Sequence, residues 1–198
     1  MSTLTATRLE RRPLVAAVLN ELPDTLVVTG LGSPSYDVYA AAPERQGVFY
    51  LWGAMGGAVS VGLGLALSQP EKQVLVITGD GEQLMGVGSL GTVAAAAPKN
   101  LNILVLDNGH FGETGMQPSH TSLGADLAAV ARGFGLAGAM SITEYEQLLE
   151  FTGRVKASDA PVFAQAYIAA GEQPRALPSR DGVGSKNAFR AFLGLETL

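Results

Sequence analysis

Two short polar motifs in this sequence have the residue types to hold a metal ion and an anion at one place. Gly79-Asp80-Gly81 follows the apolar segment 73–78, and Asn108 follows the apolar segment 101–106. Carboxylate and amide oxygens are ligands that suit a hard divalent cation such as Mg²⁺. Glycines beside the aspartate let backbone N–H groups approach an anion. These residues predict a site for a phosphorylated cofactor bound through a divalent cation.

The spacing of the two motifs predicts how the chain brings them together. Residues 82–107 separate them, and these 26 residues have room for one helix. A strand–helix–strand unit of this kind returns the second strand beside the first in a parallel sheet. Ligands of open parallel sheets bind at the carboxyl ends of the strands. We therefore expect Asp80 and Asn108 to meet at one edge of a sheet.

The remainder of the chain alternates between strands and helices in the same way. Strands are predicted at 26–29, 47–51, 73–78, 101–106 and 161–168, and helices at 7–20, 82–97, 127–133 and 187–193, with one ending near 68 and one starting after 143. Asp126 is expected to cap one helix, and Thr143 another, with Glu146 as its capping-box partner. The alternation predicts an α/β fold, a doubly wound parallel sheet flanked by helices. Residues 1–198 are expected to form a single domain with a tail from about 170.

Composition limits the functions open to the chain. A net charge of -5 argues against nucleic acid as a partner, because phosphate contacts need basic patches. The chain has no cysteine, which excludes disulfides, cysteine-bound zinc, iron–sulfur clusters and a thiolate nucleophile. Residues 1–12 lack the apolar run of a signal peptide, and glycines interrupt the long apolar stretch 51–67. We expect a cytoplasmic protein that does not enter a membrane.

Each motif also has an interpretation that involves no ligand. Asp80-Gly81 is typical of an ordinary strand-to-helix turn. Asn108-Gly109 is typical of a hairpin turn, although residues 109–122 show no alternating strand that would complete a hairpin. Met55, by its residue type alone, is typical of an apolar core position.

Taken together, the motifs resemble those of thiamine diphosphate enzymes. Gly79-Asp80-Gly81, the spacer and Asn108 are similar to the cofactor motif of that family, and Trp52-Gly-Ala-Met-Gly56 is similar to a second, upstream element. The resemblance covers about residues 25–170, the pyrophosphate-binding domain. Segment 106–115, LDNGHFGETG, is most similar to the β subunit of sulfopyruvate decarboxylase and the matching domain of phosphonopyruvate decarboxylase. The family often has Asn-Asn where this chain has Asp107-Asn108.

The resemblance implies a cofactor, a metal ion and a role for each matching residue. Asp80, the Asn108 side chain and the His110 backbone carbonyl would bind Mg²⁺. Met55 would lie under the thiamine diphosphate and impose its bent conformation, while the Gly53 carbonyl and the Met55 N–H meet the aminopyrimidine edge. The diphosphate would be held by the amides of Gly81 and Glu82. The implied cofactor-binding set is Gly53, Ala54, Met55, Gly79, Asp80, Gly81, Glu82 and Asn108.

One component of such an active site is missing from this chain. The family activates its cofactor through a glutamate on a pyrimidine-binding domain, and too few residues precede the motifs here to form that domain. The resemblance therefore implies a separate α-type subunit, and hence a hetero-oligomer that decarboxylates a small 2-oxo acid. A carboligase or acetolactate synthase-like transferase, and a non-catalytic cofactor-binding subunit, are the alternatives. Intact Asp80 and Asn108 argue against the last.

Candidates for proton transfer lie in the loop after Asn108. Glu113 falls near, although one residue out of register with, an acid that relays protons in relatives. His120 is a histidine, a residue type suited to proton transfer, and is equally compatible with a solvated loop position. The Arg11-Arg12 pair is interpreted as a solvated helix face. Arg175, Arg180 and Lys186 of the tail either reach an anionic substrate or lie on the surface.

Overall fold

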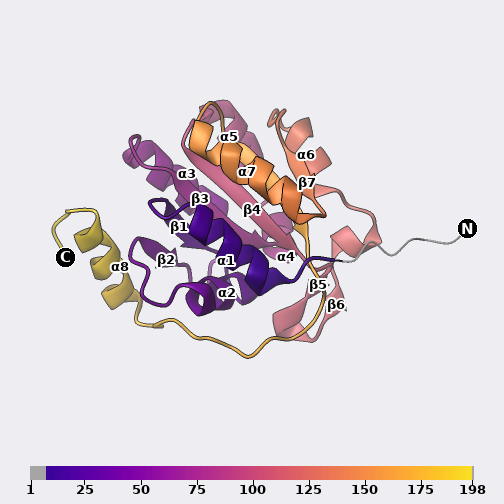
Figure 1. Ribbon diagram of the computed structural model, residues 1–198, viewed down its shortest axis with the longest axis horizontal. Coiled ribbons are helices and arrows are strands. Elements are labelled where there is room, and N and C mark those ends of the chain that lie inside the picture. Colours follow the sequence, from indigo (N-terminus) through magenta and orange to yellow (C-terminus); the bar gives the residue numbers. More distant parts are fainter. Residues whose placement is uncertain (1–7, 198) are drawn as a thin grey trace, which may run out of the picture.

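A computed structural model of the chain, which describes residues 8–197, contains a six-stranded sheet with helices on both faces (Figure 1). The strand order is β2-β1-β3-β4-β8-β7 and every pair is parallel. The strands are β1 (Leu26–Thr29), β2 (Val48–Tyr50), β3 (Val74–Gly79), β4 (Leu101–Asp107), β7 (Met140–Ile142) and β8 (Val162–Tyr167). The predicted doubly wound parallel α/β fold is confirmed.

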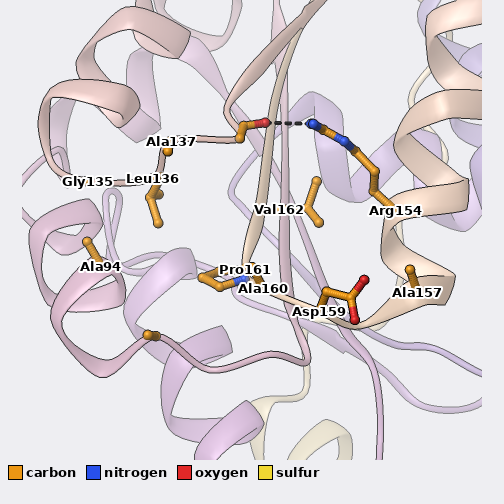
Figure 2. Close-up of a pocket in the computed structure, with 12 residues that line it drawn as sticks. Ala94, Gly135, Leu136, Ala137, Arg154, Ala157, Asp159, Ala160, Pro161 and Val162 are labelled. Atoms are coloured by element: carbon orange, nitrogen blue, oxygen red, sulfur yellow. Dashed lines mark hydrogen bonds between the residues drawn. The ribbon is translucent and has the colours of Figure 1, made fainter.

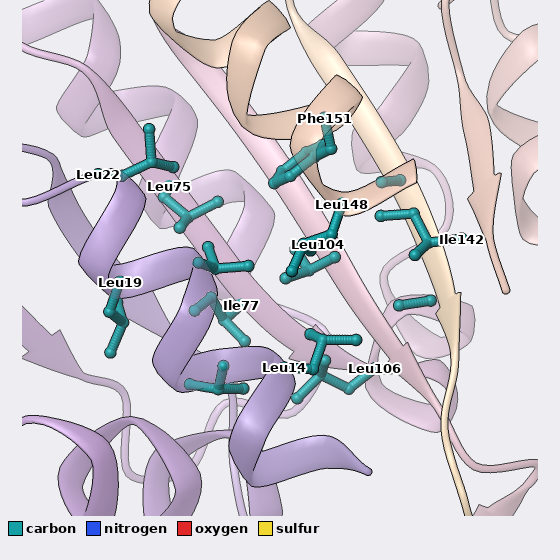
Figure 3. Packing of buried hydrophobic residues seen from close by; sticks show 14 of the residues in the cluster. Leu14, Leu19, Leu22, Leu75, Ile77, Leu104, Leu106, Ile142, Leu148 and Phe151 are labelled. Atoms are coloured by element: carbon teal, nitrogen blue, oxygen red, sulfur yellow. The ribbon is translucent and has the colours of Figure 1, made fainter. Parts of the chain in front are cut away.

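The sheet is buried on both faces. The helices are α1 (Arg11–Glu21), α2 (Ser33–Ala41), α3 (Ala58–Ser68), α4 (Asp80–Met85), α5 (Ser89–Ala96), α6 (Leu127–Gly133), α7 (Tyr145–Ala157) and α8 (Gly182–Phe192). Leu75 and Ile77 of β3 pack against α1 and α7 (Figure 3), whereas Val74 and Val76 pack against α3, α5 and α6. Successive strand residues face opposite sides, so a strand covered on both sides is apolar throughout.

Several element predictions need correction. The helix predicted at 82–97 is two helices, α4 and α5, because the chain turns at Gly86 and the backbone there lies close to Gly56. The helix predicted at 7–20 begins at Arg11, and Thr7 lies outside the described residues. Helix α2 begins at Ser33, where no helix was predicted, with Pro34 in its first turn, where proline is tolerated. Strand β7 was too short to be predicted.

The predicted helix caps are half correct. Asp126 caps α6 as expected, accepting a hydrogen bond from the Ala129 N–H at 2.8 Å. Helix α7 is instead capped by Glu144, with Gln147 as the capping-box partner. Thr143 lies one residue earlier, and its N–H and hydroxyl both donate to the Gln147 side chain.

The segment after β4 contains a small hairpin that the sequence did not predict. Strand β5 (His110–Phe111) pairs antiparallel with β6 (Gln117–Pro118), and the 3₁₀ turn η1 (Gly112–Thr114) lies between them. A second 3₁₀ turn, η2 (His120–Leu123), follows. Two-residue strands are too short to show alternation. Asn108-Gly109 precedes this hairpin and does not form its turn.

The tail returns across the carboxyl edge of the sheet. After β8 the chain runs along that edge and ends in α8, which lies beside β2 (Figure 1). The rings of Phe49 and Phe189 meet there with centroids 5.7 Å apart. Helix α8 is longer than the predicted 187–193. Among residues 8–197, no helix is long and apolar enough to cross a membrane.

Candidate cofactor site

The carboxyl ends of β3 and β4 lie side by side, because Gly79 pairs with Leu106 in the sheet register. A pocket of about 150 Å³ opens at this edge. It brings together most of the residues predicted from the motifs, namely Met55, Gly79, Asp80, Gly81, Glu82, Asn108, His110 and Glu113. Gly53, Ala54 and His120 do not line it.

Asp80 is a buried acid of this pocket. Its side chain is 2% exposed, and the hydroxyl of Ser119 donates a hydrogen bond to its Oδ2. Burial raises the pKa of Asp80, and the nearby Asp107 carboxylate raises it further, against the lowering effect of the Ser119 hydrogen bond. A buried carboxylate with a raised pKa lacks compensating positive charge. A cation at this position would supply that charge.

Asp107 is a second buried carboxylate, one residue before Asn108. Its Oδ1 accepts hydrogen bonds from the Gly109 N–H at 2.9 Å and from the Thr121 hydroxyl at 2.7 Å. Its Oδ2 accepts from Gln165 Nε2 at 2.6 Å. Asp107 therefore stabilises the turn that begins at Asn108. Sequence reasoning missed this role, and the only signal was an acid at the end of a mainly apolar strand.

Asn108 begins a turn that its own side chain stabilises. Its Oδ1 accepts from the His110 N–H at 2.8 Å, and its backbone carbonyl lies 2.8 Å from His110 Nδ1. Gly109 has φ +72°, a conformation that glycine adopts without strain. The amide oxygen of Asn108 retains a second lone pair that is free to bind a metal.

The donor set at this edge suits Mg²⁺ rather than a metal that prefers nitrogen. No group of three or more histidine, aspartate or glutamate side chains in the described part of the chain could hold an ion. Asp80, Asn108 and a backbone carbonyl are oxygen donors, and Mg²⁺ is commonly held by one carboxylate with phosphate and water oxygens. The residues present therefore fit a magnesium ion shared with a phosphorylated ligand.

Helix α4 begins at Asp80, so the amides of its first turn have no partner within the helix. Glu82 lies in this turn and its side chain points away from solvent. Glu82 Oε2 accepts from the Leu31 N–H and the Thr78 hydroxyl, both at 2.9 Å. Burial raises the pKa of Glu82, although these hydrogen bonds lower it. The Glu82 carboxylate thus fixes the loop after β1 against α4, while its amide is available to an anion.

Met55 is presented at the pocket by a strained loop. Its side chain is 39% exposed, so it is not a core methionine. Ala54 has φ +49° and Gly56 has φ +92°. A Cβ added at Gly86 would lie 2.0 Å from the Gly56 carbonyl oxygen, so the break between α4 and α5 supports this loop directly.

Glu113 lies at the far side of the pocket, where it pairs with the tail. Arg175 Nη2 lies 3.2 Å from Glu113 Oε2, and the Tyr36 hydroxyl lies 3.5 Å from the same oxygen. Burial raises the pKa of Tyr36, and the Glu113 charge raises it further. His120 is exposed on η2. The structure thus brings Glu113, but not His120, to the predicted site.

The Arg11-Arg12 pair is not the solvated helix face that we predicted. Arg11 is 6% exposed and lines the pocket, and its Nε lies 3.0 Å from Oδ2 of the fully buried Asp37. Arg12 Nε lies 3.0 Å from Asp37 Oδ1. The periodicity of α1 gave no signal of this, because Asp37 comes from α2.

A larger pocket, of about 440 Å³, lies at the opposite edge of the sheet (Figure 2). It is bounded by the start of β8 at Pro161 and Val162, the end of α7 at Arg154 and Ala157, and the loop after α6. Arg154 donates to the Gly138 carbonyl at 2.6 Å. None of the predicted site residues lines this pocket. The larger volume of this pocket does not make it the functional site, because ligand sites also need convergent polar groups.

The fold and the edge-of-sheet site define a doubly wound α/β domain equipped to hold a phosphorylated cofactor, and comparison with known proteins identifies its family. Residues 32–166 match the family "Thiamine pyrophosphate enzyme, C-terminal TPP binding domain", and the chain belongs to this family.

Among its relatives is the sulfopyruvate decarboxylase subunit beta of Methanothermobacter thermautotrophicus, 41% identical over 163 residues, which are 82% of this chain and 84% of that protein. The phosphonopyruvate decarboxylase of Streptomyces viridochromogenes is 39% identical over 95% of this chain, which spans only 47% of that protein. The crystal structure of benzoylformate decarboxylase from Polynucleobacter necessarius superposes with a TM-score of 0.74 at 15% identity, over 88% of this chain and 36% of that chain. That last likeness concerns the fold alone.

Proposed function

We propose that this chain binds thiamine diphosphate through Mg²⁺ at the edge-of-sheet pocket. Asp80, the Asn108 side chain and the His110 carbonyl would hold the metal, and the amides of Gly81 and Glu82 the diphosphate. The observation that carries the proposal is that one pocket is lined by Asp80, Asn108 and Met55 in a chain of this family. Met55 would support the cofactor from below, with the backbone of Gly53 and Ala54 beside the aminopyrimidine.

We further propose that the chain is the cofactor-binding subunit of a 2-oxo acid decarboxylase. When bound, thiamine diphosphate supplies an electron sink for the pair left by CO₂ loss. The names of its relatives support this activity, and the "subunit beta" names support a separate α-type subunit that provides the activating glutamate. Glu113, which lines the pocket, would exchange a proton with the substrate. His120 would contribute to catalysis only if a partner subunit covers η2 and extends the active site to it.

Calorimetric titration of the purified chain with thiamine diphosphate tests the cofactor site. The titration is run with and without Mg²⁺, and with and without a coexpressed pyrimidine-domain partner. We expect binding that requires Mg²⁺ and is lost in Asp80→Ala while the circular dichroism spectrum is retained. Asp159→Ala, at the opposite edge of the sheet, is the matched control and should bind as the wild type does. Unchanged cofactor affinity in Asp80→Ala would contradict the site.

The activity is tested by CO₂ release from 2-oxo acids by the chain together with its partner. Release that requires both chains supports the two-subunit decarboxylase. Cofactor binding without CO₂ release from any 2-oxo acid would contradict the decarboxylase and favour the transferase or non-catalytic alternatives.

A further inference from the structure

A second, more polar pocket adjoins the cofactor pocket on the side of the tail. It encloses about 290 Å³, and residues from both ends of the chain line it. Its charged lining residues are two arginines and two glutamates, Arg11, Arg175, Glu113 and Glu172, and the others are Ser33, Tyr36, Asn108, Gly112, Met116, Gly171 and Gln173. Five residues line both pockets, so the two spaces are adjacent, and a ligand that reaches past these residues would contact both: Arg11, Ser33, Asn108, Gly112 and Glu113.

Arg11 is a fixed cation at the boundary between the two pockets. It is buried, ion-paired to Asp37 at 3.0 Å, and donates from Nη1 to the Ser33 hydroxyl at 2.9 Å. Arg12 also pairs with Asp37, so two arginines share one buried carboxylate and a net positive charge remains. A guanidinium held in this way is oriented to bind acid oxygens in pairs.

Arg175 is the second cation of this pocket, and the tail carries it there. The segments on either side of it are tied down, because Arg12 donates to the Pro174 carbonyl and Trp52 Nε1 donates to the Ser179 carbonyl at 2.8 Å. The Arg175 guanidinium lies 5.9 Å from the centre of the Tyr36 ring. Its pair with Glu113 is solvent-exposed, at 63% and 38% of the two side chains, so an incoming anion can replace it.

We propose that Arg11 and Arg175 form a subsite for a second acid group, a phosphonate or sulfonate, on the 2-oxo acid substrate. The proposal rests on the proposed function, and it makes Arg175 a specificity-determining residue. Substrates without a second acid group would leave this pocket to water and would bind more weakly.

The charge changes of decarboxylation explain why these cations suit the distal acid group better than the carboxylate. The carboxylate leaves as neutral CO₂, so a cation paired with it would stabilise the substrate more than the transition state and slow the reaction. A distal acid group keeps its charge throughout. A cation on it therefore improves binding without opposing the chemical step.

The lining residues also distinguish this subsite from the diphosphate site. Asp80, Gly81 and Glu82 line only the cofactor pocket, and Arg175 lines only the polar pocket. A role of Arg175 in holding the diphosphate would instead make cofactor affinity depend on it. Cofactor titrations of the variants below separate these cases.

The test is calorimetric binding of 3-phosphonopropionate, an unreactive probe, to the full chain with thiamine diphosphate and Mg²⁺. Propionate, which lacks the phosphonate, is the reference ligand. We expect Arg175→Gln to weaken phosphonopropionate binding about tenfold, as for loss of one charge-assisted hydrogen bond. Arg175→Lys should recover part of that loss. Arg180→Gln, an exposed arginine of the same tail that does not line the pocket, should bind as the wild type does.

Equal weakening in Arg175→Gln and Arg180→Gln would overturn the subsite, because a general charge effect would then explain it. Absence of phosphonopropionate binding in the wild type, or a loss of cofactor affinity in Arg175→Gln, would overturn it too. The proposed function fails independently of these results, if no cofactor binds or no 2-oxo acid loses CO₂. With an active complex, Arg175→Gln should raise the KM for a phosphonate- or sulfonate-bearing 2-oxo acid and leave that for pyruvate unchanged.

Discussion

The buried carboxylates of Asp80 and Asp107, at the ends of adjacent strands, share the single hydroxyl of Thr121. Thr121 Oγ1 lies 2.7 Å from Asp107 Oδ1 and 3.2 Å from Asp80 Oδ2. One hydroxyl hydrogen can serve only one of these oxygens at a time. The two carboxylates therefore compete for this hydrogen, and the charge of Asp107 raises the pKa of the buried Asp80; a divalent cation beside Asp80 would supply the opposite charge.

Asp80→Asn should stabilise the chain when neither metal nor cofactor is present. Burial raises the pKa of Asp80, so the folded state binds a proton more tightly than the unfolded state. Stability from this group is then present at acid pH and is lost as pH rises from about 4 through the raised pKa. We expect Asp80→Asn to flatten that decline and, at neutral pH, to raise the melting temperature by about 2–4 °C per kcal/mol gained.

Mg²⁺ should reverse this order. Added Mg²⁺ with thiamine diphosphate should raise the melting temperature of the wild type and leave Asp80→Asn unchanged, since binding to the folded state alone stabilises it. If the melting temperatures of the wild type and Asp80→Asn change with pH in the same way, the buried charge of Asp80 does not destabilise the folded chain.

Gln165→Leu should lower the stability of the chain by removing the hydrogen bonds that Gln165 makes behind the site. Gln165 is fully buried, donates to Asp107 Oδ2 and accepts from the Ala128 N–H at 2.9 Å. Leucine would leave Asp107 Oδ2 and the Ala128 N–H without these hydrogen-bond partners, which costs about 3 kcal/mol. Urea unfolding would measure the loss. The exposed Gln117→Leu, as a control, should change stability by less than about 0.5 kcal/mol.

Gly86→Ala should displace the loop that presents Met55. A Cβ at Gly86 would lie 2.0 Å from the Gly56 carbonyl, whereas a Cβ at Gly88 would have no atom within 4 Å. We expect Gly86→Ala to lower stability by about 1–3 kcal/mol through overpacking and to weaken cofactor binding. Gly88→Ala should be neutral. Equal melting temperatures and equal cofactor affinities for Gly86→Ala and Gly88→Ala would contradict the inference that close packing at Gly86 positions the Met55 loop.

Trp52 should report the state of the site by fluorescence. It is the single tryptophan of the chain and lies three residues before Met55, with its ring 6.2 Å from that of Tyr36. We expect its emission to change saturably when thiamine diphosphate binds with Mg²⁺, because an added aromatic ligand alters its surroundings. Asp80→Asn should show no such change at the same concentrations. An identical response without Mg²⁺ would contradict the metal-linked site.

The main features of the fold and of the candidate site could be predicted from local patterns. The apolar runs that became β3 and β4, with the polar residues that follow each, predicted neighbouring strands with Asp80 and Asn108 at one edge. Asp126 was correctly identified as a helix cap, because capping depends on residues three positions apart. Predictions failed where elements were short, as for β5, β6 and β7, or where a helix began among turn-forming residues, as for α2.

The sequence by itself determined the class of fold and the chemistry of the motif residues, since both follow from residue type and near-neighbour spacing. Only the tertiary structure decided which distant side chains complete the site. Arg11 became a buried cation because α2 places Asp37 against it, and Arg175 reached Glu113 because the tail crosses the carboxyl edge of the sheet. Such contacts join residues far apart in the chain, and no local period encodes them.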